Sequence, residues 1–195
     1  QFEIKIDSSA APGIYKIVYA TPPEENNFDF IYDGRETVAF KFSQENGVEF
    51  TESEENKLWA SYIKSMDMVN QTISNYYQKD GKDKKGFNAV FKVLKDTQTS
   101  YEALASGRLA SAFITANRPY IPTEYEDYNT YSKNVKKHYF SQIDFSNYIL
   151  QSSTFLTNRV ISYVFNMVEN PTDDTYKTLV DDVYNAIDDK DLEIK

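Results

Sequence analysis

The 195-residue sequence has no cysteine, a single histidine and no apolar run that approaches the length of a membrane helix. The absence of cysteine excludes a thiol nucleophile, a disulfide, a zinc–thiolate site and an iron–sulfur cluster built by this chain. The single histidine, His138, excludes a metal site made of several histidines. Because a membrane helix needs about 20 consecutive apolar residues, we expect no transmembrane segment here.

Charge and aromatic content are the two unusual features of the composition. Acidic residues outnumber basic ones by 30 to 21, which gives a formal charge of −9 and a pI near 4.7. Phosphate repels a net anion, so we expect no nucleic-acid partner. The chain also contains 16 Tyr, 13 Phe and 1 Trp. An excess of tyrosine is typical of half-buried positions, where the ring packs inside and the hydroxyl reaches the surface.

The length of the chain predicts one domain, or a small domain joined to a larger one. A chain of this size buries enough surface to fold without a disulfide or a metal ion. The sequence begins at Gln1, with no initiator methionine and no signal sequence. We therefore expect a processed or cut protein, whose compartment has to be inferred indirectly.

The first fifty residues have the pattern of short antiparallel strands. Residues 2–6 alternate apolar and polar side chains, which predicts a strand with one apolar face. Further β-rich runs cover residues 14–19, 28–32, 37–42 and 48–50. Asp33-Gly34 predicts a hairpin between the second and third of these runs, and Asn46-Gly47 predicts a turn before the last. We therefore expect an antiparallel sheet of four to five strands, as a partial β-sandwich-like domain over residues 1–50.

From Thr51 onward the apolar residues recur with helical spacing. Thr51 and Glu54 fit a capping box at the start of the first helix. Apolar residues at spacings of three and four then predict a core-facing helix that ends near Gln78. Further helices are predicted over residues 87–106, 109–117, 155–168 and 173–187. We expect a larger all-α domain over residues 51–195 and an α+β fold for the whole chain.

The segment from 118 to 153 is less regular and holds the candidate binding surface. Its prolines predict an extended start. An acidic stretch with a tyrosine at every third position, from Tyr125 to Tyr131, fits a helical turn, and residues 133–143 fit a short helix that contains His138. The candidate binding residues for a sugar or peptide are Arg118, Tyr120, Tyr125 and Tyr128. Packing into the core is the alternative role for these tyrosines.

No pattern in the sequence identifies a catalytic or cofactor site. Acidic pairs such as Asp181-Asp182 are adjacent on one predicted helix, whereas a hydrolase places its two acids across a cleft, about 5–10 Å apart. Residues 79–86 lack the third acid and the terminal glutamate of a calcium loop. His138 has no nucleophile-elbow pattern to accompany it, and phosphate-binding and zinc-hydrolase motifs are missing. We therefore expect no enzymatic activity, no metal and no cofactor.

Several stretches resemble the N-terminal region of a family of exported Bacteroidetes proteins. Residues 11–17 and 27–32 resemble the end of its β-rich domain. The stretches RPYIP (118–122), HYFSQIDFS (138–146) and LQSS (150–153) resemble the helical region that follows. The family is the non-catalytic N-terminal region of thiol-disulfide interchange proteins of the TlpA and AhpC/TSA-like type. One departure is that Arg118 is followed directly by Pro119, where the family pattern has a residue between them.

The resemblance implies a location, a partner and a role. It implies a periplasmic or outer-membrane-anchored protein whose catalytic thioredoxin-fold domain lies C-terminal to this chain. The chain would position that redox domain, or bind a protein or peptide client and so raise its concentration near the redox cysteines. The resemblance carries no catalytic residue to this sequence. Two alternatives stay open: a stand-alone module that binds glycan or peptide, and a hydrolase that uses His138 or an acidic pair.

Overall fold

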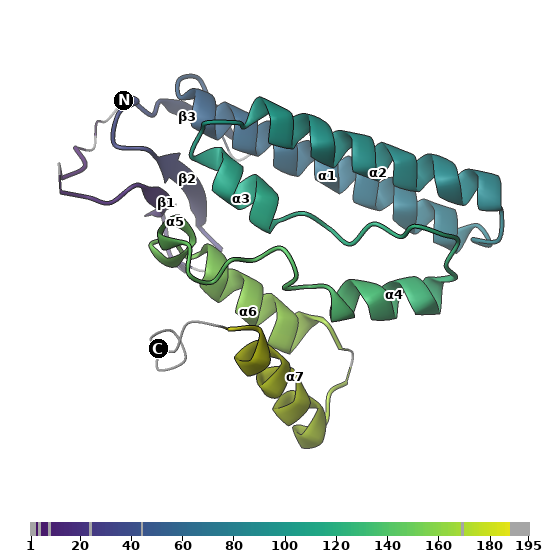
Figure 1. Ribbon diagram of the computed structural model, residues 1–195. Coiled ribbons are helices and arrows are strands. Elements are labelled where there is room, and N and C mark those ends of the chain that lie inside the picture. Colours follow the sequence, from purple (N-terminus) through teal and green to yellow (C-terminus); the bar gives the residue numbers. More distant parts are fainter. Residues whose placement is uncertain are drawn as a thin grey trace.

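The structure is a computed structural model of the chain, and it describes residues 3, 5–7, 9–23, 25–43, 45–168 and 170–187. In this part the strands are β1 (Gly13–Val18), β2 (Asn27–Tyr32), β3 (Phe40–Ser43) and β4 (Gly47–Phe50). They are followed by α1 (Glu54–Gln78), α2 (Lys84–Leu104), α3 (Ala110–Ala116), α4 (Tyr128–Lys137), α5 (Tyr148–Gln151), α6 (Phe155–Asn166) and α7 (Asp173–Ala186). The predicted α+β class, with strands first and helices after them, is confirmed (Figure 1).

The four strands form two separate antiparallel hairpins. β1 pairs with β2, and β3 pairs with β4 across the predicted turn at Asn46-Gly47. The predicted hairpin at Asp33-Gly34 is wrong, because no ladder joins β2 to β3 in the described residues. The Asp33 carboxylate instead accepts hydrogen bonds from the backbone N–H groups of Arg35 and Glu36, which turns the chain away from β2. The strand predicted over residues 2–6 rests on Phe2 and Ile4, which lie outside the described residues.

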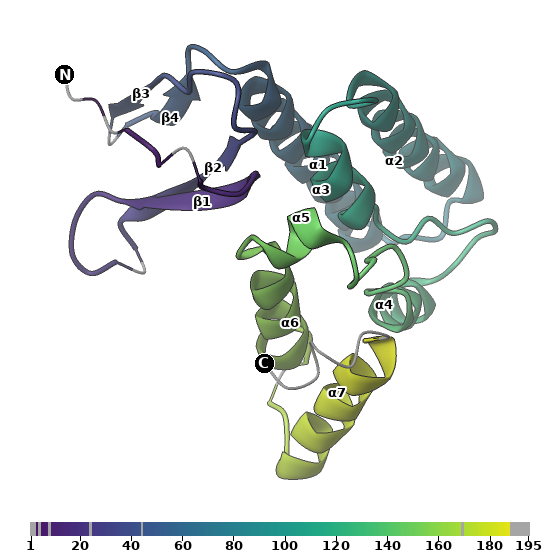
Figure 2. The same cartoon turned by 60° about the vertical axis from the view of Figure 1, so that its left-hand side comes forward.

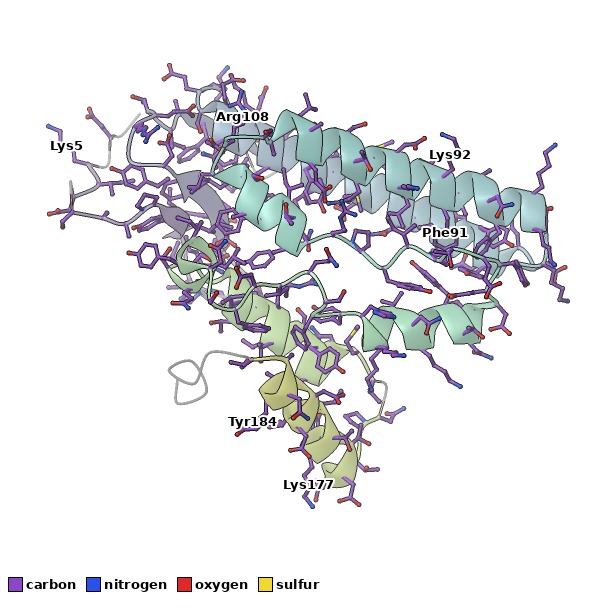
Figure 3. The ribbon with its side chains drawn as sticks, in the orientation of Figure 1. Lys5, Phe91, Lys92, Arg108, Lys177 and Tyr184 are labelled. Carbon is purple, nitrogen blue, oxygen red and sulfur yellow. The ribbon has the colours of Figure 1, made fainter. Side chains whose placement is uncertain are left out.

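The long helices α1 and α2 lie side by side and form the largest helical contact of the fold (Figure 2). The predicted apolar stripe of α1 is confirmed, and its buried members are Tyr62, Met66, Val69 and Ile73. α2 contributes Phe87, Phe91 and Leu94 to the same core. Figure 3 shows Phe91 on the side of α2 that faces α4, whereas Lys92 points outward. The helical periodicity of the sequence thus identified the buried face of both helices.

The first helix begins two residues later than its predicted cap implies. Its N-cap is Ser53, whose hydroxyl accepts a hydrogen bond from the Asn56 N–H. The backbone N–H groups of Thr51 and Glu52 both donate to the carbonyl of Ala39. These bonds hold the two residues in the loop that follows β4, so the predicted capping box at Thr51 is wrong.

The helix predicted over residues 133–143 is also wrong in its bounds. α4 ends at Lys137, and His138 is the capping residue, with its N–H donating to the carbonyl of Asn134. Beyond it the chain makes tight turns, because the N–H of Ser141 reaches only three residues back, to His138. The Ser141 hydroxyl donates to the same carbonyl, which competes with helix continuation.

A shared core joins the first hairpin to the helices. Ile14 of β1 and Ile31 of β2 belong to the same buried cluster as the apolar faces of α1, α2 and α3. A smaller cluster joins α6 to α7 through Tyr163 and Leu179. The division into domains at residue 50 remains a prediction. Within the described residues, none of the helices combines the length and apolarity that crossing a bilayer requires.

Candidate ligand-binding site

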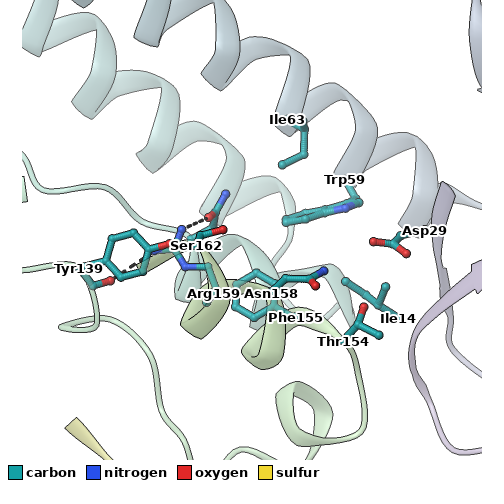
Figure 4. A pocket seen from close by; sticks show the side chains of 11 residues that line it. Ile14, Asp29, Trp59, Ile63, Tyr139, Thr154, Phe155, Asn158, Arg159 and Ser162 are labelled. Carbon is teal, nitrogen blue, oxygen red and sulfur yellow. Dashed lines mark hydrogen bonds between the residues drawn. The ribbon is translucent and has the colours of Figure 1, made fainter. Parts of the chain in front are cut away.

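Two adjacent cavities lie between α1 and the later helices. The first, about 220 Å³, is bounded by β1, β2, α1 and α6, and we call it the hairpin cavity (Figure 4). The second, about 240 Å³, is bounded by α1, the segment 117–120 and α4, and we call it the tyrosine cavity. Four residues line both of them: Ile63, Asn117, Tyr139 and Arg159. The two cavities therefore meet at the guanidinium of Arg159.

Arg159 is held in place by neutral groups. Its Nη1 donates to Asn117 Oδ1 and its Nη2 donates to the Tyr139 carbonyl, both at 3.3 Å. The guanidinium carbon lies 4.1 Å from the centre of the Tyr139 ring, in a cation–π arrangement. The third nitrogen, the buried Nε–H, has no hydrogen-bond partner among the residues that the structure describes. The side chain is thus oriented by two of its five N–H groups, and its Nε–H is among those not used.

The positive charge of Arg159 is not neutralised within the described part of the chain. None of the ion pairs there includes it, although the chain carries a formal charge of −9. Burial lowers the pKa of the Arg159 guanidinium, but an arginine stays protonated at neutral pH. Arg159 is half-buried, and even partial burial of a charge without a counter-charge is costly, because the interior solvates it less well than water does. An anionic ligand would offset that cost.

The walls of the hairpin cavity combine an apolar patch with polar side chains. Trp59 of α1 and Phe155 of α6 line it, together with Ile14 and Ile63 (Figure 4). Trp59 is stacked on Tyr62, with ring centres 5.6 Å apart, so the indole is fixed in orientation. Small-molecule sites likewise combine apolar and aromatic walls with placed polar groups, although this cavity has a larger polar share than most of them.

A carboxylate and a hydroxyl line the same cavity on the side of the first hairpin. Within the described part of the chain, the buried Oδ1 of Asp29 and the buried Oγ1 of Thr154 have no hydrogen-bond partner. The nearest cation to Asp29 is Lys16, whose Nζ lies 3.6 Å from Oδ1 in a half-exposed pair. Figure 4 shows Asp29 and Thr154 at the opposite side of the cavity from Arg159. The residues that carry these two acceptors and the Arg159 donor therefore line one cavity.

The tyrosine cavity contains two of the predicted site residues, Arg118 and Tyr120. The guanidinium of Arg118 is already paired with Glu102, with Nε donating to Oε1 at 2.8 Å and Nη2 donating to Oε2. The Tyr120 hydroxyl donates to Glu126 Oε1 at 2.6 Å. Burial and the hydrogen bond to Glu126 raise the pKa of Tyr120 to about 12. Both predicted residues are thus committed to partners within the chain.

The other two predicted residues, Tyr125 and Tyr128, do not line either cavity. The Tyr125 hydroxyl donates to the carbonyl of Gly81, and its ring packs against Phe87. Tyr128 is 62% exposed and contacts the ring of Tyr77 edge-on. The structure therefore brings Arg118 and Tyr120 together and places the other pair near the loop between α1 and α2.

The described residues hold no catalytic arrangement around His138. Its ring stacks on Tyr120, with centres 5.0 Å apart and planes 7° from parallel. No serine hydroxyl or carboxylate of the described residues hydrogen-bonds to the ring, as a triad would require. In those same residues, no group of three or more His, Cys, Asp or Glu side chains is arranged to hold a metal ion.

Sequence reasoning missed Arg159, Trp59 and Asp29. One signal for Arg159 was present, because it interrupts the apolar stripe that runs through Phe155 and Tyr163 of the predicted helix. A charged residue on a core-facing stripe indicates either a buried pair or a site. Asp29 gave no such signal, since its role depends on which face of the hairpin meets α6.

Comparison with known proteins identifies no relative of this chain. The chain matches no family model, no curated protein and no solved structure.

Proposed function

We propose that this chain is a non-catalytic binding module and that its ligand carries a carboxylate, which Arg159 binds. The observation that carries the proposal is a half-buried arginine that lines two cavities, has only neutral partners among the described residues and has a buried Nε–H with no partner there. A carboxylate matches the planar fork of a guanidinium, and such charge-assisted bonds are about twice as strong as neutral ones. A charged centre of this kind favours a peptide over a neutral glycan.

The surrounding charges favour a monoanion over a phosphate dianion. Asp29 lines the hairpin cavity and Asp67 lines the tyrosine cavity, so each extra negative charge on the ligand meets further repulsion. The carboxylate of a peptide or amino acid carries only one charge. Its apolar remainder would lie against Trp59 and Phe155.

The test uses dipeptides with a free or an amidated C-terminus. Ala-Gly, Ala-Leu and Ala-Phe are each added to the purified chain, and the thermal midpoint and Trp59 fluorescence are recorded. Trp59 is the only tryptophan of the chain and lines the hairpin cavity, so its emission reports on that site alone. At a hundredfold excess over Kd the free acid stabilises the fold by about 2.7 kcal/mol, and amidation abolishes the shift.

Arg159→Gln removes the charge and is expected to abolish the stabilisation by the free acid. Arg159→Lys keeps the positive charge but loses the planar guanidinium, so it is expected to retain part of the stabilisation by the free acid. This variant separates a loss of recognition from misfolding. Arg108→Gln is the matched control, because Arg108 is exposed between α2 and α3 (Figure 3). Equal shifts for acid and amide, or no shift with any of the dipeptides, would overturn the proposal.

The sequence resemblance supports a setting for this module. We propose that it is the accessory region of an exported, periplasmic or outer-membrane-anchored thioredoxin-like protein, in which it holds a peptide client near the redox cysteines. The test is to read the coding sequence on both sides of the chain. A C-x-x-C between a predicted strand and helix supports this setting, and its absence from the coding sequence removes it without affecting the binding proposal.

A further inference from the structure

The hairpin cavity has a cationic side chain on its α6 side and an anionic one on its hairpin side, with apolar rings and Asn158 between them (Figure 4). Arg159 lines the α6 side, and Asp29 and Thr154 line the hairpin side; the buried Nε, Oδ1 and Oγ1 atoms of these side chains have no hydrogen-bond partner among the described residues. Trp59 and Phe155 form the wall between these two sides (Figure 4). Opposite charges held apart by apolar walls are complementary to a ligand with the reverse polarity.

We infer that the hairpin cavity binds a small zwitterion, with its carboxylate at Arg159 and its ammonium group at Asp29 and Thr154. The inference rests on the proposed function and adds the second charge of the ligand and its size class. The chemical class is a free α-amino acid or a dipeptide, because both carry an ammonium and a carboxylate on a short frame. An ammonium donates three hydrogen bonds, and Asp29 Oδ1 and Thr154 Oγ1 provide two of the acceptors.

The volume of the cavity sets the size of the ligand. At about 220 Å³ it is smaller than the sites of drug-sized ligands, which occupy roughly 300–1,000 Å³. A longer peptide would therefore leave its amino group outside the cavity, where Asp29 cannot reach it. Trp59, which lies in the same wall, adds a cation–π contribution for an ammonium that passes over its face.

Two positive groups near Asp29 would repel the ammonium of the ligand: the Lys16 side chain and the N-terminus of α6. Lys16 pairs with Asp29 at 3.6 Å, which is beyond hydrogen-bond distance, and half-exposed pairs of this kind contribute little. The N-terminus of α6 at Thr154 carries only a partial positive charge of roughly half a unit. Lys16 does not line the cavity, so among the described residues Asp29 is the only charged side chain at this end of it.

The experiment is a thermodynamic cycle between one residue and one ligand group. Trp59 fluorescence gives the Kd of Ala-Leu and of N-acetyl-Ala-Leu for the wild-type chain and for Asp29→Asn. We expect acetylation and Asp29→Asn each to weaken binding at least tenfold. Once either change is made, the other is expected to have almost no further effect, because both remove the same interaction. Glu49→Gln, on the exposed face of β4, is the control for the loss of one charge.

The outcomes separate this inference from the proposed function. If acetylated and free dipeptides bind equally while amidation still abolishes binding, the zwitterion inference is wrong and the carboxylate proposal stands. If no free acid binds, both fail. Leucine, Ala-Leu and Ala-Ala-Leu are compared to identify the source, and tightest binding of the tripeptide would overturn the size limit. Lys16→Gln removes the competing ammonium and is expected not to weaken binding; a loss of affinity would contradict the inference.

Discussion

The side-chain amide of Asn56 exchanges two hydrogen bonds with the backbone of Ile31. Its Nδ2 donates to the Ile31 carbonyl at 2.8 Å, and its Oδ1 accepts from the Ile31 N–H at 2.6 Å. Ile31 lies opposite Ile14 in the β1–β2 ladder. Asn56 bonds the N–H and C=O of Ile31 from the edge of β2 that does not face β1. One side chain of α1 thus takes the place of a neighbouring strand and ties the hairpin, which carries Asp29, to the helices.

Replacing Asn56 with alanine is expected to destabilise the fold by about 2–4 kcal/mol. Both residues are almost fully buried, so the Ile31 N–H and C=O would be left without partners, at about 1–3 kcal/mol each. Urea unfolding followed by circular dichroism measures the change. Asn75→Ala, at an exposed position on the same helix, is the control and stays within about 0.5 kcal/mol of wild type. A small effect of Asn56→Ala would show that water replaces the amide.

A second buried side chain of α1, Glu55, fixes the start of α3. Its two carboxylate oxygens accept hydrogen bonds from the backbone N–H groups of Leu109 and Ala110, at 3.1 and 2.8 Å. Glu55→Gln retains one acceptor and loses the charge that faces the helix end, so we expect a loss of about 1–2 kcal/mol in the free energy of unfolding. Glu54→Gln, the exposed neighbour, is the matched control. Equal effects of the two variants would contradict this role for Glu55.

These two residues also show where sequence reasoning ends. Helical periodicity predicted the buried face of α1, because burial of Tyr62 and Ile73 follows from local spacing alone. Asn56 and Glu55 break that pattern as buried polar groups, and their partners lie 25 and 54 or 55 residues away in the sequence. The predicted pairing of β2 with β3 across Asp33-Gly34 was wrong for a similar reason, since a turn signal does not specify which strands pair.

The candidate site was only partly accessible from the sequence. Arg118 and Tyr120 were identified from an irregular aromatic segment, and they do line a cavity. The sequence could not show that Glu102 already neutralises Arg118, or that Arg159 has no such partner among the described residues. Whether Arg118 or Arg159 has a carboxylate partner depends on the tertiary packing of α2 and α6, which cannot be read from composition and spacing.

Arg118→Met is expected to reduce stability and leave dipeptide binding unchanged. Burial by itself raises the pKa of the Glu102 carboxyl, but hydrogen bonds from Arg118 and Gln98 outweigh it and lower that pKa below its usual 4.5. A lowered pKa means that the pair stabilises the fold above about pH 4.5 and that this contribution is lost as the pH falls further. The variant should therefore lose about 1 kcal/mol at pH 7 and less at pH 3, as measured by urea unfolding. A large loss of dipeptide affinity in this variant would show that Arg118 takes part in binding.

Tyr62 is expected to make the fold sensitive to alkali. It is fully buried, and its hydroxyl donates to Gln98 Oε1 at 2.9 Å. Burial is the main cause that raises the pKa of Tyr62 from 10.0 to about 12. The unfolded chain therefore releases this proton at lower pH than the folded chain, so stability is full below about pH 10 and falls as the pH rises toward 12. A difference of about two pKa units corresponds to a loss of about 2–3 kcal/mol.

The Tyr62→Phe variant isolates this contribution. It loses the hydrogen bond to Gln98 and is less stable than wild type at pH 7, but it has no proton to release at this position. Its stability should therefore decline less steeply between pH 10 and 12, and the two profiles should converge toward the upper end of that range. Tyr184→Phe is the control, because Tyr184 is exposed on α7 (Figure 3) and its replacement leaves the profile unchanged. Parallel profiles for wild type and Tyr62→Phe would assign the alkaline loss of stability to other tyrosines. Tyr131 is the next to replace, because burial raises its pKa to about 12 as well.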